Sequence, residues 1–315
     1  MAQAFLLPFE EPLVRLRDQI DQLRALGSTP NAEIATLEEQ HETLTNEIYA
    51  RLTAWEKVQL CRHPLRPSTL DYVNALTEPF VELCGDRGFA DDKSIVTGLA
   101  TFRGRNIVIA GHRKGRSAKE NAERNFGMPH PEGYRKAKRI FELADRFCLP
   151  IVTFIDTAGA YPGLAAEERG QSEAIGACIA ALSRVTVPVV SIVVGEGGSG
   201  GALALGVGNE VLLQRFATYS VITAEGCASI LWRTASRAPE AAERLKVTAQ
   251  DLLALGAIDK IIDEPRRGAH VDPEGAIRSL GNALESALNG LCTLDGHALR
   301  EQRYARFRAI GRYTA

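Results

Sequence analysis

The sequence predicts an α/β domain over residues 85–265, with a largely buried sheet covered by helices. Short β-branched apolar runs alternate with helical segments across short connections, which is typical of this fold class. Two of these runs are followed directly by glycine-bearing turns, at 156–163 and 195–201. Ligand sites of such sheets lie beyond the carboxyl ends of the strands. We therefore expect the two turns to border a shared pocket.

The chain ahead of this domain, residues 1–66, predicts a helical hairpin followed by a linker. Apolar residues step by three and four along 13–23 and again along 34–55, and a turn at 27–30 interrupts them. This spacing indicates two helices that pack antiparallel. We expect their apolar stripe to pack within the chain, and a subunit contact is the alternative. The proline-rich stretch 63–67 forms the linker.

The other elements follow from capping residues, prolines and period-two apolar runs. Ser68 or Thr69 caps a helix, Arg103–Arg105 forms a hairpin turn, and Pro131 opens a helix. Prolines 150 and 188 each precede an apolar run that is buried on both faces. The expected elements are helix 68–84, strands 94–102 and 106–111, helix 131–147, strand 150–155, helix 167–185, strand 189–194, strands 209–213 and 217–222, helices 227–237 and 249–255, strand 257–262, and a mainly helical segment from 268 onward.

Composition excludes several functional classes. The 315 residues carry a formal net charge of -2, which predicts no general attraction to nucleic acid or anionic membranes. No apolar run approaches the roughly 18 residues of a membrane helix, and the acidic start lacks the basic region of a signal peptide. The six cysteines and six histidines have no metal-ligand spacing. We expect a cytoplasmic protein with free thiols and no metal in this chain.

The turn at 195–201 holds five glycines within seven residues and separates a strand from a short helix. Glycine allows another molecule to approach the bare backbone, here at Gly198. The amides of Ser199, Gly200 and Gly201 are the unpaired donors of a helix start, and such donors suit an anionic oxygen. We interpret the turn as an oxyanion pocket.

Two other motifs fit the same glycines. Residues 195–200 satisfy G-x-G-x-x-G, but Gly208 cuts the following helix short and no acidic residue lies about 20 positions on, so a dinucleotide site is disfavoured. Residues 197–201 satisfy the G-x-S-x-G of serine hydrolases, with Asp259, Asp263 and His270 downstream. The density of glycine around Ser199 favours close backbone approach, with the serine as a helix cap. The hydrolase remains an alternative.

Further candidate residues precede this turn. The turn 156–163 could be a plain connection, but its position at a strand end favours a function, in which Gly159 and Ala160 supply a second set of amides. The polar run 113–124 is basic; if functional, its Lys114 and Arg116 face phosphates or a carboxylate, and otherwise it is a solvated loop. His112 lines the pocket or fills a structural role.

Several long blocks of sequence resemble one known family. The blocks are Asp86–Lys93, Gly111–Arg116, Asn125–Pro129, Pro131–Lys136, Asp156–Gly163, Glu167–Ala174, Gly195–Gly201 and Glu225–Trp232. In this order they resemble the carboxyltransferase alpha subunit of bacterial acetyl-coenzyme A carboxylase, and the likeness runs from about residue 4 to the end. Two departures are Ala158, where the family usually has proline, and Arg267, where it usually has glycine.

The resemblance implies a crotonase-like superhelix of ββα units over residues 67–265, with a C-terminal helical segment over 266–315. It implies that the chain transfers the carboxyl group of carboxybiotin, held on a biotin carboxyl carrier protein, to acetyl-CoA, which forms malonyl-CoA for fatty acid synthesis. It also implies a zinc-ribbon beta subunit, an α2β2 assembly and a biotin carboxylase as partners. The family's oxyanion-stabilising glycine pair corresponds to Gly200 and Gly201. Another biotin-dependent carboxyltransferase or decarboxylase subunit, and a non-catalytic scaffold, are alternatives.

Overall fold

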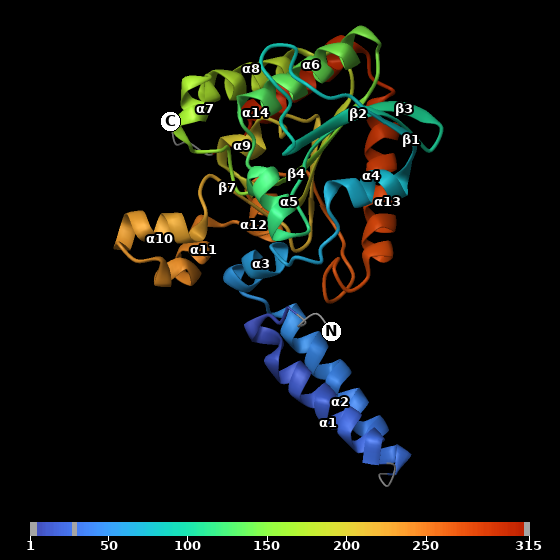
Figure 1. Ribbon diagram of the computed structural model, residues 1–315. Coiled ribbons are helices and arrows are strands. Elements are labelled where there is room, and N and C mark those ends of the chain that lie inside the picture. The colour runs from blue at the N-terminus through green and yellow to red at the C-terminus, as the bar shows by residue number, and fades with distance from the viewer. Residues whose placement is uncertain (1–4, 27–29, 312–315) are drawn as a thin grey trace.

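The structure is a computed structural model that describes residues 5–26 and 30–311. Its centre is a mixed sheet of eight strands in the order β1-β2-β3-β4-β5-β6-β8, with β7 paired to the far end of β5 (Figure 1). The first three strands are antiparallel, and every pairing from β3 onward is parallel. The strands are β1 (Thr77–Glu82), β2 (Ile95–Phe102), β3 (Arg105–His112), β4 (Ile151–Thr157), β5 (Val189–Gly198), β6 (Glu210–Gln214), β7 (Thr218–Ser220) and β8 (Lys260–Ile262).

Helices cover both faces of this sheet, as the apolar strand sequences predict. Side chains alternate across a strand, so Val189 and Val193 of β5 enter one core while Val190 and Ile192 enter the other. The first core lies under α6 (Pro131–Arg146), α8 (Gln171–Arg184) and α12 (Ala249–Ala254), and the second lies under α4 (Thr69–Leu76) and α13 (Pro273–Leu291). Because both faces are covered, the carboxyl ends of the parallel strands remain as the accessible edge. The predicted α/β architecture is confirmed.

The helices account for most of the remaining chain. They are α1 (Glu11–Leu26), α2 (Asn31–Ala50), α3 (Ala54–Cys61), α4 (Thr69–Leu76), α5 (Ala118–Glu123), α6 (Pro131–Arg146), α7 (Leu164–Glu168), α8 (Gln171–Arg184), α9 (Ser199–Leu203), α10 (Ala224–Trp232), α11 (Ala238–Leu245), α12 (Ala249–Ala254), α13 (Pro273–Leu291) and α14 (Gly296–Arg308), with 3-10 turns η1 (Pro8–Glu10), η2 (Asn125–Gly127) and η3 (Ala235–Arg237).

The N-terminal hairpin is confirmed, and it extends away from the body of the molecule (Figure 1). Its base is held by Leu13, which packs with Tyr49 and Leu60 in one apolar cluster, so part of the stripe is buried within the chain. The second helix is shorter than predicted, because Thr53 starts a new helix: its hydroxyl accepts a hydrogen bond from the Glu56 amide at 3.2 Å. The predicted turn at 27–30 falls mostly outside the described residues.

Three other element predictions are wrong in their boundaries. The helix expected over 68–84 ends at Leu76, and the residues after it form the edge strand β1. The helix expected over 167–185 is interrupted at Gly170, whose φ of 79° is left-handed. Strand β5 continues through the glycines to Gly198 instead of ending at residue 194. Four of the seven residues of the glycine run, 195–198, are therefore strand.

Two histidines stack where the hairpin, the linker and the segment before α13 meet. The rings of His63 and His270 lie 3.9 Å apart, centroid to centroid, at an interplanar angle of 27°. Burial lowers the pKa of His63, and burial together with His63, Arg66 and Arg267 lowers the pKa of His270 to about 3. Both rings are therefore neutral in the folded protein at neutral pH.

This pair predicts a loss of stability in acid. A histidine whose folded pKa lies below its unfolded value of about 6.5 supports the folded state fully above that pH and destabilises it as the pH falls. Between pH 7 and pH 5 we expect His270 to contribute a loss of about 1–2 kcal/mol in the free energy of unfolding. Urea unfolding of the wild type and of His270→Gln at pH 7 and pH 5 measures this contribution, and the free energy of unfolding should fall more in the wild type. An equal fall in the two proteins would contradict the prediction.

Candidate functional site

The glycine turn sits where β5 ends and α9 begins. Gly198, and not Ser199 as we predicted, occupies the N-cap with extended backbone, and Ser199 follows with a left-handed φ of 52°. Such a φ is uncommon for a residue with a side chain and reverses the chain direction sharply. Ser199 is exposed, Gly200 is half-buried and Gly201 is buried. The turn therefore runs from the surface into the sheet edge within three residues.

The second turn lies directly against the first, as predicted from the sequence. A Cβ atom on Gly198 would lie 2.0 Å from the carbonyl oxygen of Ala158. One on Gly201 would lie 2.5 Å from the carbonyl carbon of Gly159 and 2.6 Å from the amide nitrogen of Ala160. No real side chain tolerates such distances, so both positions require glycine. The structure thus brings Gly159, Ala160, Gly198 and Gly201 together.

The free amides of this arrangement are on the glycine turn. The first amides of a helix have no intrahelical acceptor, and within the described chain no bond runs from Ser199, Gly200 or Gly201 nitrogen to an acceptor outside α9. A buried amide without a partner is rare in folded proteins. The Gly159 amide is not a free donor, contrary to our prediction, because it donates to the Thr157 hydroxyl at 3.1 Å.

An ion pair joins the two turns to the basic run. Lys114 Nζ donates to Asp156 Oδ1 at 2.6 Å, and the same oxygen accepts the Glu196 amide at 3.0 Å. Burial alone would raise the pKa of Asp156, but the Lys114 ammonium holds it below its usual value. Asp156 also contacts Gly195, where a Cβ would lie 2.4 Å from Oδ1. Lys114, which we predicted to bind substrate, pairs with Asp156 in this structure.

A second charged network fixes the glycine strand from the other side. Arg62 Nε donates to Glu196 Oε1 at 3.0 Å, and Arg62 Nη1 donates to Glu225 Oε1 at 2.5 Å. This network ties the C-terminal end of α3 to β5 and to the start of α10. Sequence reasoning missed Arg62, Glu196 and Glu225, since 134 and 163 residues separate the partners and no local pattern marks such pairs.

Of the two remaining candidates, His112 is buried and Arg116 is exposed. His112 is only 1% exposed, and neither ring nitrogen has a hydrogen-bond partner in the described chain. Burial lowers its pKa to about 4, and the Asp156 carboxylate offsets this only partially, so the ring is neutral at pH 7. Arg116 is exposed and pairs with Asp71. Of the two, only Arg116 faces solvent.

A polar cavity of about 190 Å³ lies beside this site. Lys114, Arg116, Asp156 and Gly195 line it, together with the linker around Arg66. Each of its cations is paired with a carboxylate: Lys114 with Asp156, Arg116 with Asp71, Arg66 with Glu264, and Arg62 with Glu196 and Glu225. The cavity is therefore polar yet nearly balanced in charge, which suits a neutral polar group more than a polyanion.

The serine-hydrolase arrangement is not assembled. His270 stacks on His63 at the base of the hairpin, and Asp259 accepts a hydrogen bond from Arg306 Nε at 2.7 Å. Within the described residues no histidine bonds to the hydroxyl of Ser199. A serine nucleophile needs an adjacent base, and this geometry supplies none.

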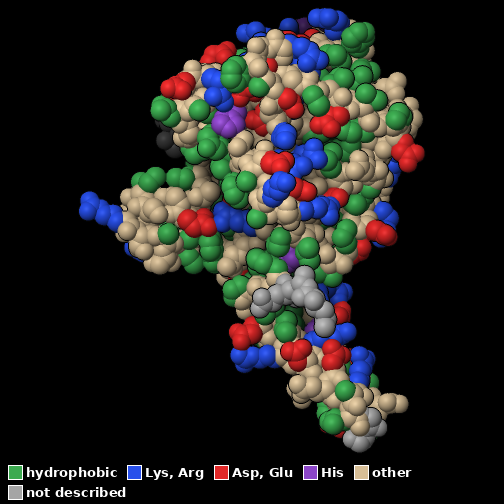
Figure 2. Space-filling model, viewed as in Figure 1, with side chains coloured by type: hydrophobic (Ala, Val, Ile, Leu, Met, Phe, Trp, Pro, Cys, Tyr) green, Lys and Arg blue, Asp and Glu red, His purple; other side chains and the backbone are tan. Residues whose placement is uncertain are grey.

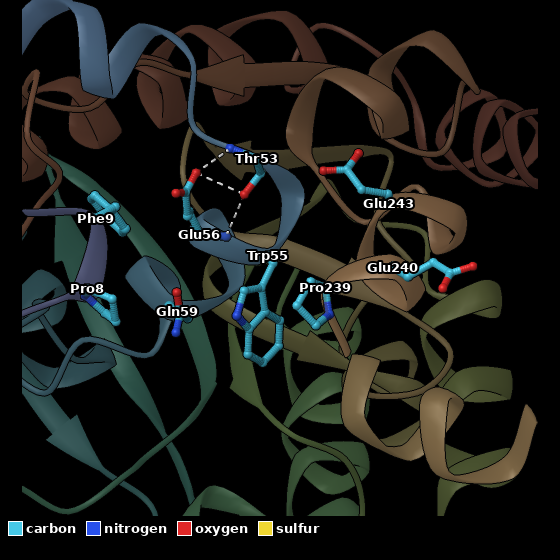
Figure 3. Close-up of a pocket in the computed structure, with 9 residues that line it drawn as sticks. All are labelled: Pro8, Phe9, Thr53, Trp55, Glu56, Gln59, Pro239, Glu240 and Glu243. Carbon is cyan, nitrogen blue, oxygen red and sulfur yellow. Dashed lines mark hydrogen bonds between the residues drawn. The ribbon is translucent and has the colours of Figure 1, made fainter. Parts of the chain in front are cut away.

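A different cavity, of about 480 Å³, lies between the base of the hairpin, α3 and α11 (Figure 3). Trp55 and Pro239 lie next to one another along it. Its carboxylates are already engaged: Glu56 bonds Thr53, Glu243 accepts the Ala54 amide, and Glu240 pairs with two arginines. None of the predicted site residues borders it, so it plays no part in the glycine site.

Over residues 5–26 and 30–311, no three histidine, cysteine or acidic side chains cluster as a metal site. In the same ranges, no helix has the length and apolarity that a bilayer crossing requires.

Comparison with known proteins identifies the relatives of the chain. A family model described as "acetyl co-enzyme A carboxylase carboxyltransferase-like" matches residues 6–311. The acetyl-coenzyme A carboxylase carboxyl transferase subunit alpha of Sorangium cellulosum is 58% identical over 314 residues, which cover 99% of both chains. The subunit of the same name from Thermus thermophilus is 53% identical over 312 residues, covering 98% of this chain and 99% of its relative.

Solved structures with the same fold are more distant. Transcarboxylase 12S matches with a TM-score of 0.58 at 22% identity, over 72% of this chain and 42% of that chain. The Pseudomonas malonate decarboxylase MdcD–MdcE hetero-dimer matches with a TM-score of 0.56 at 16% identity, over 69% and 89%. This chain therefore spans less than half of the transcarboxylase chain. The predicted crotonase-like fold is confirmed, and the protein belongs to the family of acetyl-CoA carboxylase carboxyl transferase alpha subunits.

Proposed function

We propose that this chain, joined to a beta subunit, transfers the carboxyl group of carboxybiotin to acetyl-CoA and so forms malonyl-CoA. In this proposal the amides of Gly200 and Gly201 hold the ureido oxygen of biotin, and the beta subunit holds the thioester oxygen. The observation that carries the proposal is that Gly201 is buried and that its amide has no acceptor outside the helix among residues 5–26 and 30–311. The first committed step of fatty acid synthesis would then be the role of the complex.

The chemistry needs stabilised oxyanions more than a titrating side chain. When the N–CO2 bond of carboxybiotin breaks, the electron pair moves onto the ureido group, and its oxygen becomes negative. The ureido nitrogen takes a proton from the acetyl methyl, and the acetyl enolate attacks CO2. A well-aimed donor contributes on the order of 3 kcal/mol to such a transition state. The bare amides of Gly200 and Gly201 fit this role, and the neutral, buried His112 does not compete for it.

The other predicted residues take supporting roles in this proposal. Gly198 and Gly159 allow the two turns to approach, and Ala160 offers a further amide. Lys114 holds Asp156, and Arg116 borders the polar cavity. The carboxybiotin is delivered as a substrate on its carrier protein and is regenerated by a biotin carboxylase. The six cysteines, all free, favour a reducing compartment, and we place the reaction in the cytoplasm.

A serine-independent mechanism predicts that Ser199→Ala retains carboxyl transfer. The substitution removes the hydroxyl and leaves the amides in place, so we expect activity within about threefold of wild type. A fluorophosphonate should leave Ser199 of the wild-type protein unlabelled. Labelling of that serine, together with loss of activity in the alanine variant, would favour the hydrolase.

Several features support a second chain at this site. The relatives carry the name "subunit alpha", and the matched portion of transcarboxylase 12S is 42% of its chain. The segment 221–245, which we call the arm, projects from the body (Figure 1). Its Val221, Ile230 and Leu231 are 74%, 73% and 62% exposed, and hydrophobic side chains lie along its upper edge in Figure 2. Exposed apolar side chains in such number are typical of an interface. We propose a zinc-ribbon beta subunit as the partner, in an α2β2 assembly.

The arm provides a direct test of this partner. The pair Ile230→Asp and Leu231→Asp should abolish co-elution with the beta subunit, because burying a carboxylate without a partner is strongly unfavourable. Leu255→Asp, at the exposed C-cap residue that follows α12 outside the arm, serves as the control and should still co-elute. Co-elution of the double variant at wild-type yield would contradict the role of the arm.

The function itself is tested by mixing the chain with a zinc-ribbon beta subunit and assaying malonyl-CoA formation from acetyl-CoA and carboxybiotin. Acetyl-CoA is compared with propionyl-CoA as acceptor, and malonyl-CoA decarboxylation is measured in parallel. Preference for acetyl-CoA supports the proposal. Preference for another acyl-CoA, or decarboxylation alone, would assign the chain to a different member of this class, such as a decarboxylase.

A further inference from the structure

The segment between α5 and α6 has an unusual backbone. Asn125, Phe126 and Gly127 take left-handed φ values of 47°, 55° and 78° in succession. Glycine adopts this conformation without steric strain, but a bulky residue such as phenylalanine is strained in it. Left-handed residues that persist at bulky side chains are held by their surroundings and concentrate at functional sites.

The surroundings here hold the segment against the glycine site. The Gly127 amide donates to the Arg124 carbonyl at 2.8 Å, and a Cβ on Gly127 would lie 2.7 Å from Lys114 Cγ and 3.4 Å from the Asp156 carbonyl oxygen. The Pro129 carbonyl accepts the Tyr161 amide at 3.0 Å. The segment is thus packed on the ion pair and on the turn 156–163.

The aromatic ring of Phe126 is not stabilised by packing within the described part of the chain. Phe126 is 59% exposed, and within the described residues its ring belongs to no buried apolar cluster and no aromatic pair. Phe147 is similarly exposed at 63%, but it follows the last turn of α6 with an ordinary φ of -99°. A strained backbone that holds an aromatic ring in solvent needs a contact outside the chain to explain it.

The charges around the ring are mostly positive. Arg113, Arg116, Lys119 and Arg124 precede it within thirteen positions, and basic side chains gather over α5 in Figure 2. Arg116 and Arg124 are paired with carboxylates, whereas Arg113 has no ion pair within the described chain. An apolar face beside such cations suits a flat ring that carries a single negative charge.

We propose that Phe126 is a substrate-contact residue on which the bicyclic ring of carboxybiotin packs. The inference rests on the proposed function, since it concerns the donor substrate of the same site. The segment borders the turn 156–163, so the group in reach is the one whose oxygen meets the Gly200 and Gly201 amides. The nucleotide of coenzyme A is separated from its reacting thioester by the long pantetheine arm. It therefore lies too far from the reacting atoms to occupy this position.

The test uses the assembled complex in the reverse direction, with free biocytin as the carboxyl acceptor. The carboxylate moves from malonyl-CoA to the ureido nitrogen, and the nitrogen's proton ends on the acetyl methyl. We expect Phe126→Ala to raise the KM for biocytin about tenfold and to leave the KM for malonyl-CoA unchanged. Phe126→Tyr, which keeps the ring, should restore the wild-type KM, and Phe147→Ala should have no effect on either constant.

A glycine variant separates a contact role from a structural one. Phe126→Gly relieves the left-handed backbone, so its melting temperature should exceed that of Phe126→Ala while the KM for biocytin stays high. A rise in the KM for malonyl-CoA would overturn the proposal in favour of the nucleotide, and weakened co-elution with unchanged constants would overturn it in favour of a subunit contact. A wild-type complex that does not carboxylate biocytin would refute the proposed function itself.

Discussion

We expect the replacement of Gly201 with valine to lower carboxyl transfer by about a hundredfold or more, while the chain still folds and assembles. A Cβ at this position would lie 2.5 Å from the carbonyl carbon of Gly159 and 2.6 Å from the amide nitrogen of Ala160. Backbone atoms cannot move aside as the end of a side chain can, so the two turns must separate. The amides then lose their aim at the developing oxyanion. Malonyl-CoA formation by the complex measures the effect.

Two other glycines provide graded controls for this variant. A Cβ on Gly200 would meet only the side chain of Ile175, at an ordinary 3.7 Å, so Gly200→Ala should lose less activity than Gly201→Val. Gly176 lies on an exposed face of α8 with no atom within 4 Å of its Cβ position, so Gly176→Ala should match wild type. Full activity in Gly201→Val would show that the amides of this turn do not stabilise the oxyanion.

We expect the replacement of Glu264 with glutamine to lower the free energy of unfolding by about 3–5 kcal/mol. The side chain of Glu264 is fully buried and that of Arg66 is 5% exposed, and Arg66 Nη1 donates to the carboxylate at 2.8 Å. The carboxylate also accepts the amides of Phe216 and Ala269, at 2.8 and 2.9 Å. The amide side chain removes the charge that compensates Arg66 and places N–H groups among donors. Urea unfolding measures the change.

The exposed pair of Arg266 with Glu42 is the matched control. Their side chains are 59% and 62% exposed, so Glu42→Gln should change the free energy of unfolding by less than about 1 kcal/mol. A loss below that value in Glu264→Gln would show that the buried pair is dispensable. Arg66 also donates to the Val194 carbonyl in β5 at 3.0 Å, so we expect activity to fall together with stability.

The parts of the site that depend on residues close together in the chain could be predicted from the sequence. The pattern of strand, glycine turn and helix predicted the first turn. The second turn was predicted to lie beside it because the carboxyl ends of parallel strands share one edge of the sheet. The sequence did not predict that β5 extends to Gly198, because glycine has low strand propensity. The pairing with β7, and at Gly197 also with Thr157 of β4, keeps this part of β5 extended. The break at Gly170 was missed for a similar reason, since glycine within a helical pattern is often tolerated.

Long-range charge pairs lay beyond sequence reasoning. The basic run was predicted to face a phosphate or a carboxylate; Lys114 pairs with the carboxylate of Asp156, 42 residues away in the chain. Arg62 joins Glu196 and Glu225 across more than 130 positions. Such pairs depend on which elements the fold places side by side, and no spacing in the sequence records that. The left-handed Phe126 was equally hidden, because nothing local to it demands a positive φ.

The most direct measurement of the central claim is a structure of the assembled complex with biocytin bound. We predict that the ureido oxygen lies within about 3.2 Å of the Gly200 and Gly201 nitrogens, at hydrogen-bonding angles. A ureido oxygen bound elsewhere, with these two amides bonded to water or to the partner chain, would contradict the account.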